Sequence, residues 1–310
     1  MPPVDRNNPS RAESSQSRYS LMEFMREFSD DADCLEWLWQ TRCSEDGKTA
    51  ECPKCERPRP FHKVKDRPAW DCAYCGYHLH PTAGTIFEKS STSLQLWFYA
   101  MFMVSQTRCG ISAKQLEREL GVTYKTAWRM LNLIRNQLMD ETEDTPLSGD
   151  VEVDETYHGG KPRAKALRER TGNIDKSKRA VVFGMVERGG KVRVVHLPNA
   201  GGATIKREMN RHILPASMIF TDEWPTYRGV DRTFIGHRRI RHKERIYVDG
   251  DTHTQTVEGF FGLVKNGIRG TYHAVSHKWL QGYLNEFAWR YNRRDDERAM
   301  FFSLALTAAR

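Results

Sequence analysis

The chain has 310 residues, enough for two or three domains, and its 48 Lys and Arg residues against 40 Asp and Glu residues give a formal net charge of +8. A hydrophobic fraction of 39%, including 8 Trp, excludes global disorder, and the charge favours a polyanionic partner without identifying one. The longest apolar stretch, residues 96–104, is about half the length of a membrane span, and the N-terminus lacks the apolar core of a signal peptide. We therefore expect a cytoplasmic or nucleoid-associated protein.

The first half of the chain changes composition several times. The order predicts a disordered N-terminus (1–18), a helical segment (19–48), a Cys- and Pro-rich module (49–90), a second helical region interrupted at Gly110 and Gly121 (91–140), and a linker with acids, Pro and Gly (141–149). The Cys-rich module is too small to hold a core of its own.

The second half, residues 150–300, has a different pattern. Three runs rich in β-branched residues, 151–157, 180–187 and 191–197, predict strands, and Arg188-Gly189-Gly190 predicts the hairpin turn between the last two. Further elements are expected as a helix at 203–212, a short strand at 218–220, and helices at 256–268 and 277–291. This order predicts an α/β sheet layered with helices, so the chain is expected to be multidomain.

Four of the seven cysteines form two Cys-x-x-Cys pairs, Cys52/Cys55 and Cys72/Cys75, with sixteen residues between the pairs. Four thiolates at this spacing are typical of a structural Zn²⁺ site, and metal binding would stabilise a module this small. The alternative is four buried cysteines that bind nothing. The remaining cysteines, Cys34, Cys43 and Cys109, have no paired spacing and are expected to be core thiols.

Residues 112–135 predict a helix-turn-helix. Leu116 and Leu120 mark one face of a first helix, Gly121 permits a left-handed turn, and Thr123 can cap a second helix. That second helix would bury three apolar residues and project a polar set outward, as a recognition helix in a major groove does: Tyr124, Lys125, Thr126 and Arg129. The alternative is an ordinary helical hairpin.

Three carboxylates are candidates for a functional site because of their positions in the predicted strands and helices. Asp154 lies within the strand VEVDETY, with Glu152 and Thr156 on the same face; Asp222 directly follows the apolar strand 218–220. Glu258 lies on the helix at 256–268, two turns before Lys265. Three converging acids can hold two Mg²⁺ or Mn²⁺ ions and support phosphodiester cleavage. Each acid alone is better explained as a solvated side chain.

The thirty-five residues between Asp222 and Glu258 lead to a family resemblance. This pattern, in which two Asp residues are followed after thirty-five residues by a Glu, resembles the catalytic pattern of the DDE transposases and retroviral integrases of the RNase H-like fold. From about Phe28 to Arg294 the chain is similar to ISXO-like insertion-sequence transposases, in the stretches CPKC, TAGTIFEKS, LWFYAMFMVS, VEVDETYHGG, IFTDEWPTY, HTQTVEGFFGLVKNGIRGTYH and LNEFAWRYNRR.

The resemblance implies a zinc ribbon, a helix-turn-helix and an RNase H-like catalytic domain in a bacterial transposase. It implies Asp154, Asp222 and Glu258 as catalytic carboxylates, Lys265 as a DNA contact near the reacting phosphate, and homo-oligomers on paired transposon ends. Relatives commonly carry Asn where this chain has Gln255. Some accounts of the group treat that Asn as the third catalytic position, whereas we assign that position to Glu258 because metal binding prefers a carboxylate.

Two basic segments fit an enzyme that acts on DNA. Residues 161–179 carry a net charge of +6 and residues 237–245 a net charge of +4, so each is either a phosphate clamp or an ordinary solvated face. The function expected from the sequence is metal-dependent cleavage of DNA at transposon ends and strand transfer into target DNA. The alternatives are a DNA-binding regulator descended from a transposase, and a zinc-ribbon endonuclease without strand transfer.

Overall fold

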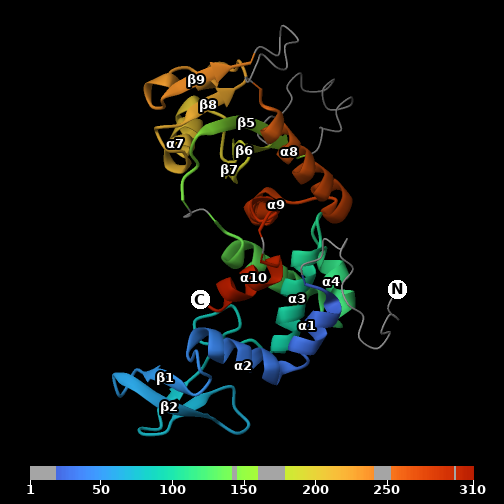
Figure 1. Cartoon of the computed structure of the whole chain (residues 1–310). Helices are drawn as coiled ribbons and strands as arrows, with labels where there is room; N and C mark the ends of the chain where they lie inside the picture. The colour runs from blue at the N-terminus through green and yellow to red at the C-terminus, as the bar shows by residue number, and fades with distance from the viewer. Residues whose placement is uncertain (1–18, 142–144, 160–178, 241–252, 297) are drawn as a thin grey trace, which may run out of the picture. The chain divides into compact units, whose positions relative to one another are not determined.

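The computed structural model describes residues 19–141, 145–159, 179–240, 253–296 and 298–310, which belong to two compact units (Figure 1). One unit contains the chain up to Gln106 together with Asp295–Arg310, and the other contains Thr107–Arg294. The predicted disorder of residues 1–18, the centre of the predicted linker and most of the two basic segments lie outside the described residues. Within the described part, every helix is too short or too polar to serve as a membrane span.

The helices of the first unit are α1 (Leu21–Glu27), α2 (Asp31–Arg42), α3 (Leu94–Gln106) and α10 (Met300–Ala308). The predicted helical pattern over residues 21–42 is divided in two, because Asp30 caps a new helix. Its carboxylate accepts hydrogen bonds from the backbone N–H groups of Ala32 and Asp33 at 2.7 and 2.9 Å. The chain therefore turns between α1 and α2 instead of continuing as one helix.

Aromatic side chains form the core of this unit. The Phe28 ring lies 5.0 Å from Phe98 of α3 and 5.5 Å from Phe301 of α10, measured between ring centroids. Phe24 of α1 lies 4.9 Å from Phe102 of α3. These rings bury large apolar areas, so they join α1, α3 and the C-terminal helix α10 into one layer although α10 follows α3 by nearly two hundred residues.

A small antiparallel sheet completes the first unit. Its strands run in the order β1 (Thr49–Cys52), β2 (Arg57–Lys63), β3 (Trp70–Cys72) and β4 (His78–Leu79). The indole ring of Trp39, from α2, stacks on Trp70 at 4.6 Å with an interplanar angle of 3°. Trp39 and Leu35 of α2 therefore supply the core that this cysteine-rich sheet lacks by itself.

The second unit begins with a helical region and continues into a mixed sheet. The helices are α4 (Ala113–Leu120), α5 (Tyr124–Leu133) and a π-helical extension η1 (Ile134–Leu138). The sheet has the order β7-β6-β5-β8-β9, with bounds β5 (Asp150–His158), β6 (Ala180–Glu187), β7 (Val192–Leu197), β8 (Met218–Thr221) and β9 (Gly236–Arg239). Strands β5, β6 and β7 form an antiparallel meander, while β8 pairs parallel with β5 and β9 pairs parallel with β8.

Helices cover both faces of this sheet (Figure 1). Helix α7 (Gly202–His212) packs on one face, where Val151 and Val153 of β5 lie in the same apolar cluster as Ile205 and Met209 of α7. Helices α8 (Gln255–Gly267) and α9 (Leu280–Asn292) pack on the other face, against alternate residues of β6 and β7. Because side chains alternate along a strand, the even-numbered carboxylates of β5 are directed toward the α8 side.

The two units do not coincide with the segments expected from composition. The helix-turn-helix region lies in the same unit as the mixed sheet, and residues 295–310 lie with the N-terminal unit. A buried ion pair accounts for the first difference. Arg135 of η1 donates to the Glu286 carboxylate of α9 at 2.6 Å, and both side chains are at most 5% exposed.

Candidate functional site

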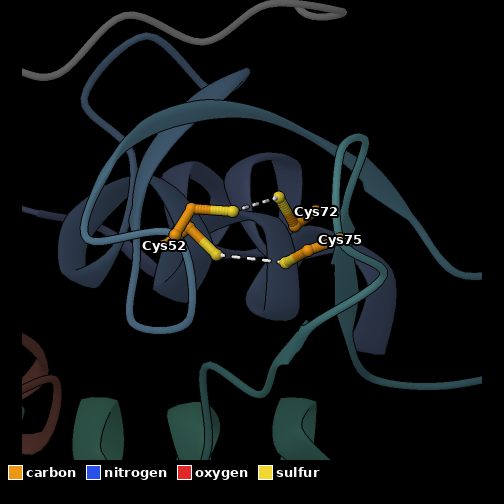
Figure 2. A group of neighbouring side chains, drawn as sticks. Cys52, Cys72 and Cys75 are labelled. Carbon is orange, nitrogen blue, oxygen red and sulfur yellow. Dashed lines mark hydrogen bonds between the residues drawn. The ribbon is translucent and has the colours of Figure 1, made fainter.

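The four cysteines of the paired motifs lie together in the first unit. Cys52 ends β1 and Cys72 ends β3, and Cys55 and Cys75 lie in the turns that follow. Figure 2 shows the sulfur atoms of Cys52, Cys72 and Cys75 directed toward the centre of the group. The Cys52 and Cys75 Sγ atoms are 3.6 Å apart, those of Cys55 and Cys72 are 4.0 Å apart, and all four lie within 4.8 Å of one another.

This geometry fits a tetrahedral metal ion. Zn–S bonds of roughly 2.3 Å in a tetrahedron require sulfur atoms about 3.8 Å apart, and all seven cysteines of the chain are free thiols. Burial acts to raise the pKa of the Cys72 thiol, but hydrogen bonds from the backbone N–H groups of Cys75 and Tyr74 outweigh it and lower the pKa to about 7. The cluster can therefore hold Zn²⁺ as a thiolate site. Of the expected core thiols, Cys34 is buried and Cys43 is partly buried, whereas Cys109 is exposed because it lies in the turn after α3.

The helix-turn-helix region has the local geometry that the sequence predicts. Gly121 has φ +65° and ends α4, and the Thr123 hydroxyl accepts a hydrogen bond from the backbone N–H of Thr126, which begins α5. Three apolar residues of α5 are buried: Ala127, Met130 and Leu131. Of the residues expected to face outward, three are exposed: Tyr124, Lys125 and Arg129. Thr126 is only partly exposed, because its hydroxyl bonds with that of Thr123 at 3.0 Å.

Asp154 and Asp222 are neighbours across paired strands. The parallel register of β5 and β8 pairs Val151 with Ile219 and Glu152 with Phe220. Asp154 and Asp222 each follow the last of these pairs by two residues, and the negative charge of Asp222 acts on Asp154, so the two carboxylates lie near each other. The Asp222 carboxylate also accepts the backbone N–H of Trp224 at 2.9 Å, which fixes the turn after β8.

Glu258 approaches the same place from helix α8. It lies in the first turn of α8, where the Thr254 hydroxyl donates to its Oε1 at 2.8 Å. The helix packs closely on the sheet because residue 184, the β6 partner of Asp154, is glycine. A Cβ atom at Gly184 would meet the Phe261 ring at 2.8 Å and the Val257 side chain at 3.0 Å.

The pKa of Asp154 reflects the nearby carboxylates. Burial is the main cause that raises the pKa of Asp154 to about 8, and the negative charges of Glu155, Asp222 and Glu258 contribute to the same shift. Asp222 and Glu258 are therefore both close enough to Asp154 for their negative charges to act on its carboxyl group. The oxygen atoms of the three carboxylates are more widely spaced than the cysteine sulfurs, since the four cysteines are the metal-type group found within 4.8 Å among the residues that the structure describes.

Lys265 lies on the solvent side of α8, two turns beyond Glu258 and about 10 Å further along the helix axis. Its Nζ lies 5.9 Å from the centroid of the Phe261 ring. Gln255, the first residue of α8, is exposed. Of the two basic segments, only Arg179 and residues 237–240 are described, and burial lowers the pKa of His237 to about 4.

Comparison with known proteins identifies the part of the chain that holds the carboxylates. Residues 146–292 match the family model described as the ISXO2-like transposase domain. The matched region, which is similar to that domain, contains Asp154, Asp222 and Glu258, while the cysteine cluster and helices α4 and α5 precede it.

Two proteins similar to this chain have names that refer to transposable elements or transposases. An uncharacterized protein in transposable element ISH50 of Halobacterium salinarum is 27% identical over 257 residues, which cover 77% of this chain and 84% of that protein. An uncharacterized transposase-like protein of Haemophilus influenzae is 24% identical over 105 residues, covering 34% of this chain and 84% of that protein. The crystal structure of the Mos1 strand transfer complex aligns over 65% of this chain and 78% of that chain, with 13% identity and a TM-score of 0.20, too low to support an inference.

The matched region contains two further glutamates for which the sequence analysis predicts no role. Glu155 faces the α7 side, where the Tyr227 hydroxyl donates to its Oε2, and burial raises its pKa. Glu152 faces the α8 side and is completely buried. Strand alternation places Glu152 on the same face as Asp154, but only the structure shows what surrounds it.

Proposed function

We propose that this chain is a transposase that cleaves DNA at the ends of its own element and joins the released 3′ ends to target DNA. The observation that carries the proposal is the convergence of Asp154, Asp222 and Glu258, from two paired strands and a helix, inside a domain of the transposase family. The mixed sheet with helices on both faces supports an RNase H-like fold for this domain. The cysteine-rich sheet supports a zinc ribbon.

The donor set at the three carboxylates fits Mg²⁺ or Mn²⁺. Both cations prefer oxygen ligands, and a partly buried cluster of like charges is stabilised by a divalent cation. When bound, two such ions would activate a water or 3′ hydroxyl and stabilise the leaving oxygen of the phosphodiester. Asp154 would have to give up a proton to ligate such an ion, because burial raises its pKa to about 8 in the metal-free protein.

The other parts of the chain place DNA against these carboxylates. The exposed side chains of Lys125 and Arg129 on α5 suit a major groove, with Tyr124 and the partly exposed Thr126 beside them. Lys265 on the solvent side of α8 suits a phosphate near the reacting one. Pairing of two element ends would require at least two copies of the chain, so we also propose a homo-oligomer on DNA and a cytoplasmic, nucleoid-associated location.

The test uses a supercoiled plasmid that carries the DNA flanking this reading frame on both sides. With Mn²⁺ or Mg²⁺, the zinc-loaded chain is expected to nick or cut at the element ends and to form joined products. Asp222→Asn is expected to lose at least a hundredfold in cleavage rate, whereas the exposed Asp231→Asn serves as a matched control and retains it. Glu258→Gln is expected to lose cleavage and Gln255→Ala to keep it, which decides the third carboxylate.

The remaining outcomes identify the alternatives. Binding to the flanking DNA without cleavage by the wild-type chain would show a regulator. Cleavage without joined products would show an endonuclease. Full cleavage by both Asp222→Asn and Glu258→Gln would refute the catalytic assignment whatever the DNA substrate.

A further inference from the structure

Glu152 is a buried carboxylate whose hydrogen-bonding capacity is filled by protein groups. It lies on β5 two residues before Asp154 and has no exposed surface. Its Oε1 accepts from Arg188 Nε at 2.8 Å and from the Thr256 hydroxyl at 3.0 Å. Its Oε2 accepts from the backbone N–H groups of Thr256 at 2.8 Å and Val257 at 3.2 Å. The ring Nδ1 of His253 also lies 3.1 Å from Oε1. The four donors fill the four lone-pair sites of the carboxylate, so Glu152 has no capacity left to ligate a metal ion.

The donors on Oε2 are the orphan N–H groups at the start of α8. Every helix leaves its first N–H groups without partners inside the helix, and the residue before the helix usually accepts one of them. That residue is Thr254 here, and its side chain makes no such bond. Glu152 of the sheet takes over this role, and its negative charge lies at the positive end of the helix dipole.

The Thr254 hydroxyl is consequently available for Glu258. It donates to Glu258 Oε1 at 2.8 Å, one turn into the helix. Glu152 thus holds the first turn of α8 against β5, and the same turn carries the carboxylate that faces Asp154. One side chain thereby sets the distance between a strand residue and a helix residue that are 104 positions apart.

Arg188 completes the arrangement by neutralising Glu152. Its guanidinium lies 3.8 Å over the Phe220 ring of β8, and its Nη2 donates to the carbonyl of His253 at 2.9 Å. The side chain of Arg188 therefore contacts β5, β8 and the chain that enters α8. The ion pair favours the observed positions of Glu152 and Arg188, because separating them would leave a buried charge without its counter-ion.

We propose that Glu152 is a positioning residue of the proposed transposase domain: it docks the start of α8 on β5 and thereby holds Glu258 on the side of the sheet where Asp154 and Asp222 lie, so that the three carboxylates can close on a metal ion. The proposal rests on the proposed function for the identity of the metal site. It assigns Glu152 no contact with metal or DNA. Its loss is therefore expected to weaken metal binding without removing a ligand.

The experiment compares four full-length, zinc-loaded proteins without DNA: wild type, Glu152→Gln, Asp154→Asn and Glu286→Gln. Glu286 is the matched control, because it is equally buried and paired with Arg135 and Arg290 but makes no contact with α8. Hydrogen exchange measures whether the first turn of α8 stays docked, and electron paramagnetic resonance of free Mn²⁺ measures metal affinity.

Glu152→Gln is expected to speed exchange at Thr256 and Val257 and to raise the dissociation constant of Mn²⁺ about 10- to 100-fold, as losses of groups that orient metal ligands do. Glu286→Gln is expected to leave the Mn²⁺ dissociation constant within about twofold of wild type and, because it destabilises the unit as a whole, to speed exchange at Thr256 and Val257 no more than at the other helices of the second unit. In the plasmid assay, the cleavage rate of Glu152→Gln is expected to recover at saturating Mn²⁺, whereas that of Asp154→Asn does not.

Unchanged exchange at the start of α8 in Glu152→Gln would overturn the docking role, with or without metal. Faster exchange with unchanged Mn²⁺ affinity, while Asp154→Asn loses Mn²⁺, would overturn the positioning role and leave the proposed function standing. Equal Mn²⁺ binding by wild type and Asp154→Asn would instead overturn the metal site of the proposed function, and the positioning role with it.

Discussion

Replacing Glu286 by Gln is expected to destabilise the second unit through a buried charge network. Glu286 lies on α9 with no exposed surface, and its carboxylate accepts from Arg135 at 2.6 Å and from Arg290 at 2.5 Å. The Tyr272 hydroxyl donates to the same carboxylate at 2.9 Å. The substitution keeps the volume of the side chain but removes the charge that both guanidinium groups face.

The size of the effect follows from the pKa of Glu286. Burial acts to raise this pKa, but Arg135 and Arg290 outweigh it and lower the pKa from 4.5 to about 2. At about 1.4 kcal/mol per pKa unit, this difference contributes roughly 3 kcal/mol to the free energy of unfolding at neutral pH. Removing one partner of a buried pair costs a similar amount, about 3–5 kcal/mol.

The pH dependence has a defined sign. A carboxyl group whose folded pKa is depressed contributes its full stability above the unfolded pKa, here 4.5, and loses it as the pH falls through the folded value of about 2. The difference between wild type and Glu286→Gln is therefore expected to be about 3 kcal/mol at pH 7 and roughly half that near pH 3.

Urea unfolding followed by hydrogen exchange at η1 and α9 measures this difference within one unit, without assuming that the whole chain unfolds in one step. The exposed Glu119→Gln on α4 is the control, expected within about 0.5 kcal/mol of wild type. A Glu286→Gln protein as stable as this control at pH 7, or a difference that is the same at pH 7 and pH 3, would refute the reasoning.

Three further outcomes are expected. Cys75→Ser should lower the zinc content below one ion per chain and speed hydrogen exchange throughout residues 49–79, and full protection of those residues without zinc would contradict a structural metal. Gly184→Ala should lower the free energy of unfolding by about 1–3 kcal/mol because the new methyl group meets Phe261, and urea unfolding without any loss would show that α8 shifts freely. For Asp154, burial and the neighbouring carboxylates raise the pKa to about 8, so the folded state retains a proton that the unfolded state releases and stability falls as the pH rises from 3.8 to 8. Asp154→Asn should therefore raise the melting temperature of the metal-free protein more at pH 8.5 than at pH 5, and an equal effect at both pH values would contradict the raised pKa.

Local rules were sufficient where neighbouring residues determine the conformation. The left-handed turn at Gly121, the cap at Thr123 and the buried face of α5 were predicted from about twenty consecutive residues and are present. The same holds for the meander, whose strands pair through the predicted turn at Arg188–Gly190. The paired cysteines were also predicted from spacing, and their sulfur atoms lie together.

Sequence patterns failed where an element depends on distant partners. Strand β2, RPRPFHK, contains two prolines and little apolar alternation, and strand β9, GHRR, has none, so neither was predicted as a strand. Both form because an existing neighbour offers backbone partners, β1 and β3 for the former and β8 for the latter. Helix α10 likewise contacts α3 through aromatic rings that no local pattern connects.

The candidate site likewise has a part that local sequence patterns predict and a part that depends on distant residues. Alternation in β5 and the position of Asp222 after β8 were enough to predict two neighbouring carboxylates, and their catalytic roles stay predictions. The environment of Glu152 was out of reach, because its donors come from a helix that begins about one hundred residues later and from a turn of another strand pair. The only local signal was strand alternation, which places Glu152 on the same face of β5 as Asp154.

Two buried glutamates thus fix two different helical elements to the same sheet-and-helix layer. Glu152 attaches the start of α8 to β5 through Arg188, and Glu286 attaches the helix that follows α5 to α9 through Arg135. A buried ion pair adds little net stability compared with apolar packing, but it strongly disfavours any arrangement in which its partners separate. The two ion pairs therefore favour one relative position of the exposed face of α5 and the start of α8 within the second unit. If α5 binds element DNA, this relative position determines which phosphate reaches Asp154, so the cleavage position would be set by the protein fold before any metal or target DNA is bound.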